Sequence, residues 1–253
     1  MNSLDRFRLD GRVAIVTGAS SGLGVAFAEG LADVGADVAI CARRESRLQD
    51  TRTRIEALGR RCLAIAADVA KVEDCNRVVE HTVAELGHVD VLVNNAGIGT
   101  AAPATREPPE EFRRVIDINL NGTYWMAQAC GRAMKDGGSI INIGSVLGST
   151  TAGLPQAAYA SSKAAIIGLT RDLAQQWTGR KGIRVNALAP GFFHSEMTAQ
   201  YPDGYIEQML GRVPAGRVGD PAELVAALIF LASDAASYIT GVVLPVDGGL
   251  LTT

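Results

Sequence analysis

Residues 159 to 163, Tyr-Ala-Ser-Ser-Lys, carry two side chains that could act together as an acid/base catalyst. Positions four apart lie on one face of a helix, so the phenol of Tyr159 and the ammonium of Lys163 would be neighbours there. A cation about 4 Å from a phenol, at an effective dielectric constant of about 20, would lower the phenol's pKa from about 10 by about three. Tyr159 could then exchange protons near neutral pH. The same spacing is common in ordinary helical pairs on a solvated face, so the rest of the chain must decide between the two interpretations.

The elements that would position this pair alternate between short β-branched runs and longer amphipathic segments, which is the pattern of repeated βαβ units. A helix is expected from about residue 22 to residue 34, directly after the first strand. Strands are expected at residues 13–17, 37–41, 62–66, 89–93, 139–143, 183–187 and 242–246. Their nearly continuous apolar character is typical of a parallel sheet buried on both faces. The sequence therefore predicts a doubly wound α/β fold with helices on both sides of the sheet.

A chain of 253 residues with 47% hydrophobic content can bury a sizeable core. No low-complexity linker, composition shift or internal repeat marks a boundary, so we expect one domain over residues 1–253. Residues 192–219 interrupt the rhythm with a long aromatic-rich insertion before the last helix. Such an insertion suggests a lid or a pocket wall.

The charges and the apolar runs exclude several classes of function. The chain has 24 Lys and Arg against 27 Asp and Glu, which leaves no basic field for nucleic acid. The first residues lack the apolar core of a signal peptide, and no apolar run approaches about 18 residues. We therefore expect a cytoplasmic protein with no membrane partner. The cysteines have no C-x-x-C spacing and are expected to be reduced and structural, without a metal: Cys41, Cys62, Cys75 and Cys130.

The turn at residues 17–24, Thr-Gly-Ala-Ser-Ser-Gly-Leu-Gly, follows the first expected strand and opens the first expected helix. Gly18, Gly22 and Gly24 would let the backbone turn tightly and approach a pyrophosphate, which the free N–H groups of the helix would bind. The spacing G-x-x-x-G-x-G departs from the usual G-x-G-x-x-G fingerprint. Although a Gly-Ser turn can be an ordinary loop, its place between strand and helix favours a dinucleotide site.

The end of the second strand bears on the choice of cofactor. Ala42 stands where a carboxylate would bind the ribose 2′-hydroxyl of NAD. Arg43 and Arg44 follow, and a guanidinium suits a 2′-phosphate by charge and by fork geometry. The sequence therefore favours NADP, with NAD possible. The alternative is that both arginines begin a solvated basic helix face with Arg47.

In a doubly wound fold the ligand binds in a crevice beyond the carboxyl ends of the strands. Two further strand ends would face this crevice. Asn94-Asn95-Ala96-Gly97 ends the fourth strand, and its two small residues would permit close approach of a ligand. The alternative is an asparagine-rich turn. Asp68 follows the third strand, where an aspartate is usually a helix N-cap.

Taken together, these motifs resemble those of the short-chain dehydrogenase/reductase family, in the family's order from about Leu9 to Gly249. The resemblance implies a single Rossmann-type domain with seven parallel strands and hydride transfer between a nicotinamide cofactor and a carbonyl or alcohol. It extends in particular to 3-oxoacyl-acyl-carrier-protein reductases and to sugar or polyol dehydrogenases, and it implies a homotetramer. It rests on residues 17–24, Asn94 to Gly97, Asn119, Ser145, Tyr159, Lys163, Pro190 and Gly191.

The resemblance implies a role for each catalytic residue. Tyr159 would donate a proton to the nascent alkoxide, and Lys163 would lower its pKa and bond the nicotinamide ribose. Ser145 would polarise the substrate oxygen, although a serine there could also be a strand-end turn residue. Asn119 would hold a water in a proton relay. The alternative is an ordinary mid-helix asparagine that bonds the backbone locally, and the neighbouring Asn121 is the control for this assignment. Ser145 lies 14 residues before Tyr159, where many relatives have 13, so a differently shaped loop between them is expected.

The resemblance also assigns the cofactor contacts. Asp68 and Val69 would bracket the adenine, residues 95–97 would contact the adenosine ribose, and Phe193 and Ser195 would lie at the nicotinamide. His194 is expected to line the pocket. The cofactor set predicted in this way is Gly18, Ser20, Ser21, Gly22, Leu23, Gly24, Arg43, Arg44, Asp68, Val69, Asn95, Ala96, Gly97, Tyr159, Lys163, Pro190, Gly191, Phe193 and Ser195.

The sequence thus predicts an NADP(H)-dependent oxidoreductase that reduces a ketone or oxidises a secondary alcohol. The alternatives are an NAD(H)-dependent polyol, sugar or hydroxysteroid-type dehydrogenase, and a dinucleotide-binding sensor or assembly subunit with little turnover. Net negative charge argues against docking an acidic carrier protein, though Arg132 could offer a local contact. An apolar wall would suit an apolar or ring-shaped small-molecule substrate: Phe192, Phe193, Met197, Tyr201 and Tyr205.

Overall fold

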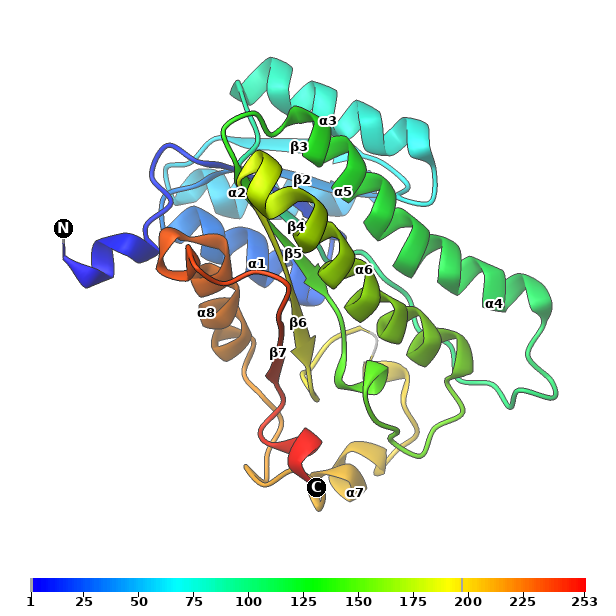
Figure 1. The fold of residues 1–253 in the computed structure, drawn as a ribbon. Coiled ribbons are helices and arrows are strands. Elements are labelled where there is room, and N and C mark those ends of the chain that lie inside the picture. The colour runs from blue at the N-terminus through cyan, green and yellow to red at the C-terminus, as the bar shows by residue number, and fades with distance from the viewer. Residues whose placement is uncertain (1, 197) are drawn as a thin grey trace.

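A single parallel sheet forms the centre of the computed structural model, which describes residues 2–196 and 198–253 (Figure 1). Its seven strands run in the spatial order β3-β2-β1-β4-β5-β6-β7, which confirms the predicted fold class. The strands are β1 Val13–Thr17, β2 Asp37–Ala42, β3 Cys62–Ala66, β4 Val91–Asn94, β5 Gly138–Ile143, β6 Ile183–Pro190 and β7 Val243–Val246. Five of them differ from the expected bounds by one to three residues at an end; β4 begins at Val91, and β6 runs on to Pro190. The longer β6 carries its last residues to the carboxyl edge of the sheet.

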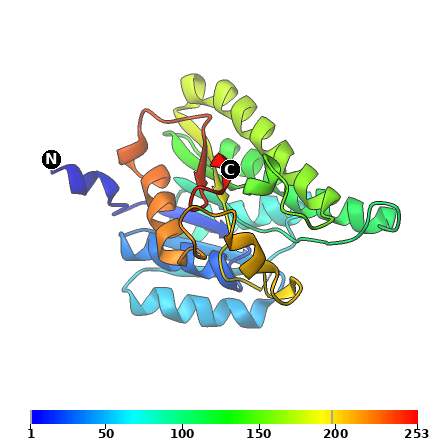
Figure 2. The ribbon, with the colours of Figure 1, turned by 90° about the horizontal axis from the view of Figure 1, so that it is seen from below.

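Helices cover both faces of the sheet, as Figure 2 shows from below. One layer consists of α1 Gly22–Asp33, α2 Glu45–Ala57 and α8 Pro221–Ala232, and the other of α3 Val72–Leu86, α5 Gly122–Ala133 and α6 Ala157–Lys181. Alternate residues of each strand face opposite layers, so Ala14 and Val16 pack with the first layer and Val13 and Ile15 with the second. Burial on both sides explains the nearly continuous apolar strands.

The helix before β5 is interrupted by one π-helical turn. It begins as α4 Pro109–Ile116, passes through η2 Asp117–Asn121 and continues as α5. Single π turns inside α-helices are often found at functional sites. Asn119 lies in this turn and is almost fully buried.

The insertion between β6 and α8 forms a small apolar cluster of its own. It contains η4 Thr198–Gln200 and α7 Tyr205–Leu210, and Figure 1 shows the C-terminus beside α7. Phe192, Met209 and Val213 of this segment pack with Leu250 of η6 Leu250–Thr252. A parallel bridge from Phe193 to Gly219 closes the two ends of the insertion. The segment is therefore anchored at its base and folded over the carboxyl edge of the sheet.

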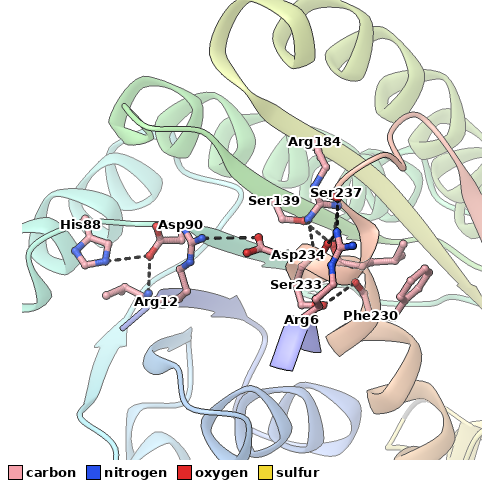
Figure 3. Close-up of polar contacts among 12 residues, drawn as sticks. Arg6, Arg12, His88, Asp90, Ser139, Arg184, Phe230, Ser233, Asp234 and Ser237 are labelled. Atoms are coloured by element: carbon pink, nitrogen blue, oxygen red, sulfur yellow. Dashed lines mark hydrogen bonds and ion pairs between the residues drawn. The ribbon is translucent and has the colours of Figure 1, made fainter. Parts of the chain in front are cut away.

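A polar network fixes α8 at the opposite edge of the sheet (Figure 3). The Arg184 guanidinium donates hydrogen bonds to the carbonyl oxygens of Leu231 at 2.9 Å and Ser233 at 3.1 Å, and the Ser139 hydroxyl also donates to Leu231, at 2.9 Å. Arg6, from η1 Ser3–Phe7, donates to the Asp234 carbonyl of η5 Asp234–Ala236 at 2.7 Å. Arg184 and Ser139 thus satisfy carbonyls at the end of α8 that have no partner within the helix, and Arg6 ties η1 to η5.

The four cysteines are free and buried, Cys41, Cys62, Cys75 and Cys130. Burial raises the pKa of Cys41, Cys62 and Cys75 to about 12, which leaves their thiols protonated and unreactive at neutral pH. Across residues 2–196 and 198–253, no helix combines the length and the apolar character that crossing a membrane requires.

Candidate active site

A cavity of about 480 Å³ opens at the carboxyl edge of the sheet. Loops from six of the seven strands reach it, because all strands are parallel and end at the same edge. Its wall includes every residue that the sequence assigned to cofactor binding, Gly18, Ser20, Ser21, Gly22, Leu23, Gly24, Arg43, Arg44, Asp68, Val69, Asn95, Ala96, Gly97, Tyr159, Lys163, Pro190, Gly191, Phe193 and Ser195.

The glycine turn forms a cradle that a side chain would fill. Gly18 and Gly22 have φ values of 69° and 56°, a region that favours glycine. A Cβ at Gly24 would collide with the Gly18 carbonyl and lie 2.6 Å from the Asn95 amide nitrogen. At the N-cap of α1, the Ser21 side chain makes no capping bond, so the first N–H groups of the helix face the cavity without that partner. Such a helix start fits the pyrophosphate of a dinucleotide.

Thr17 and Asn95 tie this turn to the end of β4. The Asn95 side chain donates to the carbonyl oxygens of Thr17 at 2.9 Å and Gly18 at 3.3 Å. In return the Thr17 hydroxyl accepts from the backbone N–H groups of Asn95 at 3.0 Å and Ala96 at 2.9 Å. Asn95 thus shapes the turn as well as lining the cavity. Sequence reasoning missed the part played by Thr17, since a threonine that ends a strand carries no signal of its own.

The two arginines after β2 have different surroundings. Arg44 donates to the hydroxyls of Ser20 at 3.2 Å and Ser21 at 2.8 Å, on the glycine turn, and forms an ion pair with Glu196 at 2.9 Å. Arg43 lines the same cavity and makes no hydrogen bond or ion pair with the part of the chain that the structure describes. Arg47, on the first turn of α2, also pairs with Glu196, at 2.7 Å. The basic residues therefore converge on the cavity rather than forming only a solvated helix face.

Asp68 shapes the turn before α3. Its carboxylate accepts a hydrogen bond from the Ala70 N–H at 3.1 Å, and its own N–H donates to Asp74 at 2.8 Å. The N-cap of α3 is Lys71, so Asp68 is a turn residue rather than the cap itself. Val69 packs against Gly122, where a Cβ would lie 2.8 Å from the valine side chain.

Tyr159 and Lys163 lie on α6, and Ser145 follows β5 at the N-cap of η3 Val146–Gly148. All three are at least nine-tenths buried. A Cβ at Gly148 would approach the Lys163 backbone to 2.8 Å, so a glycine is needed for this loop to pack closely on α6. Ser145 and Tyr159 both line the cavity, and the Ser145 hydroxyl lies near the phenol. The Ser145 hydroxyl also accepts from the Leu147 N–H at 3.1 Å, so the residue serves as a turn former as well.

Burial disfavours the charged form of each residue in this pair, the tyrosinate of Tyr159 and the ammonium of Lys163. Burial raises the pKa of Tyr159 to about 12, with the Ser145 hydrogen bond acting in the opposite direction. Burial also lowers the pKa of Lys163 to about 8. The prediction of a lowered phenol pKa is therefore wrong for this structure. That prediction counted only the attraction between the Lys163 ammonium and the phenolate. It left out the cost of removing each charged group from water, which is the largest cause of both pKa shifts.

Asn119 joins the segment after β4 to α6. Its side-chain oxygen accepts from the Ile98 N–H at 2.9 Å, and its amide donates to the Ile98 carbonyl at 2.9 Å and the Ser162 hydroxyl at 3.0 Å. Asn121 instead donates to the Asp117 carboxylate at 2.9 Å, a local bond within the same helix. Asn119 thus bonds to other segments of the chain, whereas Asn121 bonds within its own helix. Asn119 does not lie on the cavity wall, so its contact with the site runs through Ile98 and Ser162.

The insertion contributes part of the expected apolar wall. Phe192, Phe193 and Tyr201 line the cavity, whereas Tyr205 packs against Tyr201 with ring centres 5.1 Å apart and donates to the Ala152 carbonyl at 2.6 Å. Met197 lies outside the described residues.

One expectation for a single residue is wrong. His194 is exposed and does not line the cavity, because its neighbours Phe193 and Ser195 point inward while it points to solvent. Arg132 lies in the last turn of α5, which ends near the amino ends of the strands, and it is not on the wall of the cavity.

Known proteins resemble the chain over nearly its whole length. A family model described as enoyl-(acyl carrier protein) reductase matches residues 18–251. A 2-dehydro-3-deoxy-D-gluconate 5-dehydrogenase of Escherichia coli is 38% identical, with 98% of each chain covered. The 3-oxoacyl-(acyl-carrier-protein) reductase FabG of Vibrio cholerae is 42% identical over 96% of this chain and 98% of its own. The crystal structure of a gluconate 5-dehydrogenase from Burkholderia cenocepacia, in complex with NADP and tartrate, superposes with a TM-score of 0.94 at 38% identity and 100% coverage of both chains.

Proposed function

Since the chain belongs to the short-chain dehydrogenase/reductase family of oxidoreductases, we propose that it catalyses NADP(H)-dependent hydride transfer between the nicotinamide and a ketone or secondary alcohol. Tyr159 is the general acid/base in this proposal. The observation that carries it is that Ser145, Tyr159 and Lys163 line the same cavity as the glycine cradle. Hydroxyl donors and a dinucleotide site that share one cavity are what such a reaction needs.

The residues present fit a dinucleotide with a 2′-phosphate. The glycine cradle and the start of α1 suit the pyrophosphate, and Arg43 and Arg44 suit the 2′-phosphate, with no carboxylate at Ala42 to repel it. Among the relatives, the Burkholderia cenocepacia enzyme was crystallised with NADP. When bound, the dinucleotide supplies or accepts the hydride. The other proposed contacts are Ser20, Ser21, Leu23, Asp68, Val69, Asn95, Ala96, Gly97, Lys163, Pro190, Gly191, Phe193 and Ser195.

The chain's own residues would move the proton. In reduction, the Tyr159 hydroxyl donates its proton to the substrate oxygen as negative charge develops there, and the Ser145 hydroxyl donates a hydrogen bond to the same oxygen. The raised pKa of Tyr159 keeps the phenol protonated at neutral pH, which is the form that reduction uses. In oxidation the tyrosinate is required, and Ser145 and Lys163 are the groups placed to stabilise it. Asn119 positions Lys163 and Tyr159 through Ser162 and Ile98.

The substrate in this proposal is a small carbonyl compound or alcohol rather than an acyl chain on a carrier protein. The relatives' names cover both a sugar acid dehydrogenase and a carrier-dependent reductase. A net charge of -3 and the placement of Arg132 away from the cavity argue against docking an acidic carrier. Phe192, Tyr201 and Val146 give the wall an apolar part that suits a ring or a carbon chain.

We extend the proposal to a cytoplasmic homotetramer in which each chain is one domain, residues 1–253. Leu224, Leu228 and Leu231 of α8 are buried against the sheet and cannot take part in subunit contacts. The large apolar side chains that are exposed include Phe112, Tyr238 and Val242, and β7 forms an edge of the sheet beside Val242. Light scattering of the purified protein would give the mass directly.

The absorbance of the nicotinamide band tests the proposal, measured with NADPH and NADH against a panel of ketones, sugar acids, polyols and hydroxysteroids. We expect turnover of at least one small carbonyl compound with a lower KM for NADPH than for NADH. A lower KM for NADH would contradict the cofactor assignment. Binding of NADPH without turnover across the panel would favour a dinucleotide sensor.

A further inference from the structure

Among the described residues, Arg44, Arg47 and Ser21 hold the carboxylate of Glu196 at the mouth of the cavity. Its oxygens accept hydrogen bonds from Arg44 at 2.9 Å, from Arg47 at 2.7 Å and from the Ser21 hydroxyl at 2.9 Å. These donors come from the glycine turn and from the start of α2, more than a hundred residues away in sequence. The hydrogen bond from Arg44 is the main cause that holds the pKa of Glu196 below its usual value, so the side chain is an anion at neutral pH.

The segment that carries Glu196 lies directly on the glycine turn. A Cβ at Gly22 would be 3.7 Å from the Ser195 side chain, so a methyl group added at the start of α1 would touch Ser195. Arg44 also donates to the Ser20 and Ser21 hydroxyls. The anion on Glu196 therefore occupies donors that a phosphate in this corner of the cavity would use.

We infer that Glu196 is an internal anion that competes with the cofactor's 2′-phosphate for Arg44 and Arg47, and so sets the selectivity between NADP(H) and NAD(H). This inference rests on the proposed dinucleotide function. A 2′-phosphate carries about two negative charges against one on the carboxylate, and it can accept from a guanidinium fork. NAD(H) has no such group, so the ion pairs of Glu196 persist when it binds.

Displacement of Glu196 also has a consequence for the insertion. Its ion pairs join residues 192–219 to α2, whereas the base of the insertion is anchored by the bridge between Phe193 and Gly219. Release of the carboxylate frees the tip of the insertion and leaves the base in place. Binding of a 2′-phosphate at one end of the cavity is thereby coupled to movement of the wall that contains Tyr201 at the other.

Equilibrium binding tests the competition with Glu196→Gln, which removes the charge and keeps the shape. The ligands are NADPH, NADH and adenosine 2′,5′-bisphosphate, and the control is Glu207→Gln, an exposed glutamate of α7 in the same insertion. We expect Glu196→Gln to lower the Kd for NADPH and for the bisphosphate by about three- to tenfold, the scale of two exposed ion pairs. The Kd for NADH should change less than about twofold, and Glu207→Gln should change none of the three.

An unchanged or raised Kd for NADPH in Glu196→Gln would overturn the inference. Arg44→Ala separates this failure from failure of the cofactor assignment. If Arg44→Ala weakens NADPH binding while Glu196→Gln has no effect, the assignment stands and the competition is wrong. If Arg44→Ala affects NADPH and NADH equally, the assignment itself is wrong.

Hydrogen exchange gives a second readout that does not depend on activity. In the wild type, adenosine 2′,5′-bisphosphate should speed exchange of the amides at residues 198–210, and adenosine 5′-monophosphate should not. Glu196→Gln should show the faster exchange without any ligand. Exchange in the wild type that slows or stays constant with the bisphosphate would contradict the coupling.

Discussion

The Nζ of Lys163 lies 5.6 Å from the centre of the Tyr159 ring and donates its hydrogen bond, at 2.7 Å, to the carbonyl oxygen of Ile143. The lysine is thus held against the end of β5, beside the ring of the tyrosine. Both side chains are buried, and burial favours the neutral form of each, with the pKa of Lys163 lowered to about 8 and that of Tyr159 raised to about 12. The pair is poised with a protonated phenol and a readily deprotonated amine.

The pH dependence of stability should reveal Lys163. Burial lowers its pKa from the ordinary 10.5 to about 8 in the folded chain. Between those two pH values the unfolded chain binds more protons, so this residue makes the folded state more stable as pH rises. A shift of this size corresponds to about 3 kcal/mol, gained as pH rises from about 8 to 10.5 and lost over the same window as pH falls.

The measurement is the free energy of unfolding of the wild type and Lys163→Met at several pH values from 7 to 10.5. We expect the difference between the two proteins to change in favour of the wild type as pH rises. Parallel curves over the whole range would show that the folded state does not shift the lysine's pKa.

Asn119 and Asn121 form a matched pair of variants. Asn119→Ala leaves the N–H and the carbonyl of Ile98 without their side-chain partner, which should cost about 1–3 kcal/mol of stability. It also removes the bond donated to the Ser162 hydroxyl, which keeps its own bond to the Tyr159 carbonyl. Because these contacts position α6, we also expect kcat to fall at least about tenfold with a shifted pH profile. Asn121→Ala removes only a local bond and should leave the pH profile unchanged. Equal effects of the two variants on kcat and on the profile would contradict a positioning role for Asn119.

Gly24→Ala tests the cradle. The added methyl would collide with the Gly18 carbonyl and the Asn95 amide, so we expect a loss of about 1–3 kcal/mol in stability and weaker binding of NADPH. Gly168→Ala is the control, since Gly168 lies in α6 with nothing within 4 Å of a Cβ. That change should stabilise the protein by about 0.5–1 kcal/mol. Thermal unfolding and a binding titration measure both, and wild-type NADPH affinity in Gly24→Ala would argue against the cradle.

The fold could be predicted from the sequence because each strand is an apolar run bounded by turn residues. The first and third strands were placed at their observed bounds, and the helix expected from Gly22 ends one residue early, at Asp33. Strands of a parallel sheet are covered on both faces, so nearly every position in such a strand must be apolar. The glycine turn was also readable, since its position between strand and helix determines which way its N–H groups point.

Features that depend on contacts between distant segments could not be predicted. The pairing of Glu196 with Arg44 joins an insertion to the second strand end, and no local pattern places them together. His194 was misplaced because an irregular segment has no period from which to read the direction of a side chain. The pKa of Tyr159 was mispredicted because desolvation depends on how completely the surrounding elements close over the phenol.

Tyr159→Phe tests whether the Tyr159 hydroxyl donates the proton to the substrate oxygen during reduction. The measurement is the rate of NADPH consumption at the nicotinamide band with a carbonyl compound that the wild type reduces, together with the Kd for NADPH. Loss of the hydroxyl should lower kcat by at least tenfold, with about 10²- to 10⁴-fold expected for general acid catalysis. The Kd for NADPH should remain near that of the wild type. A Tyr159→Phe variant that reduces the same compound at the wild-type rate would contradict the mechanism.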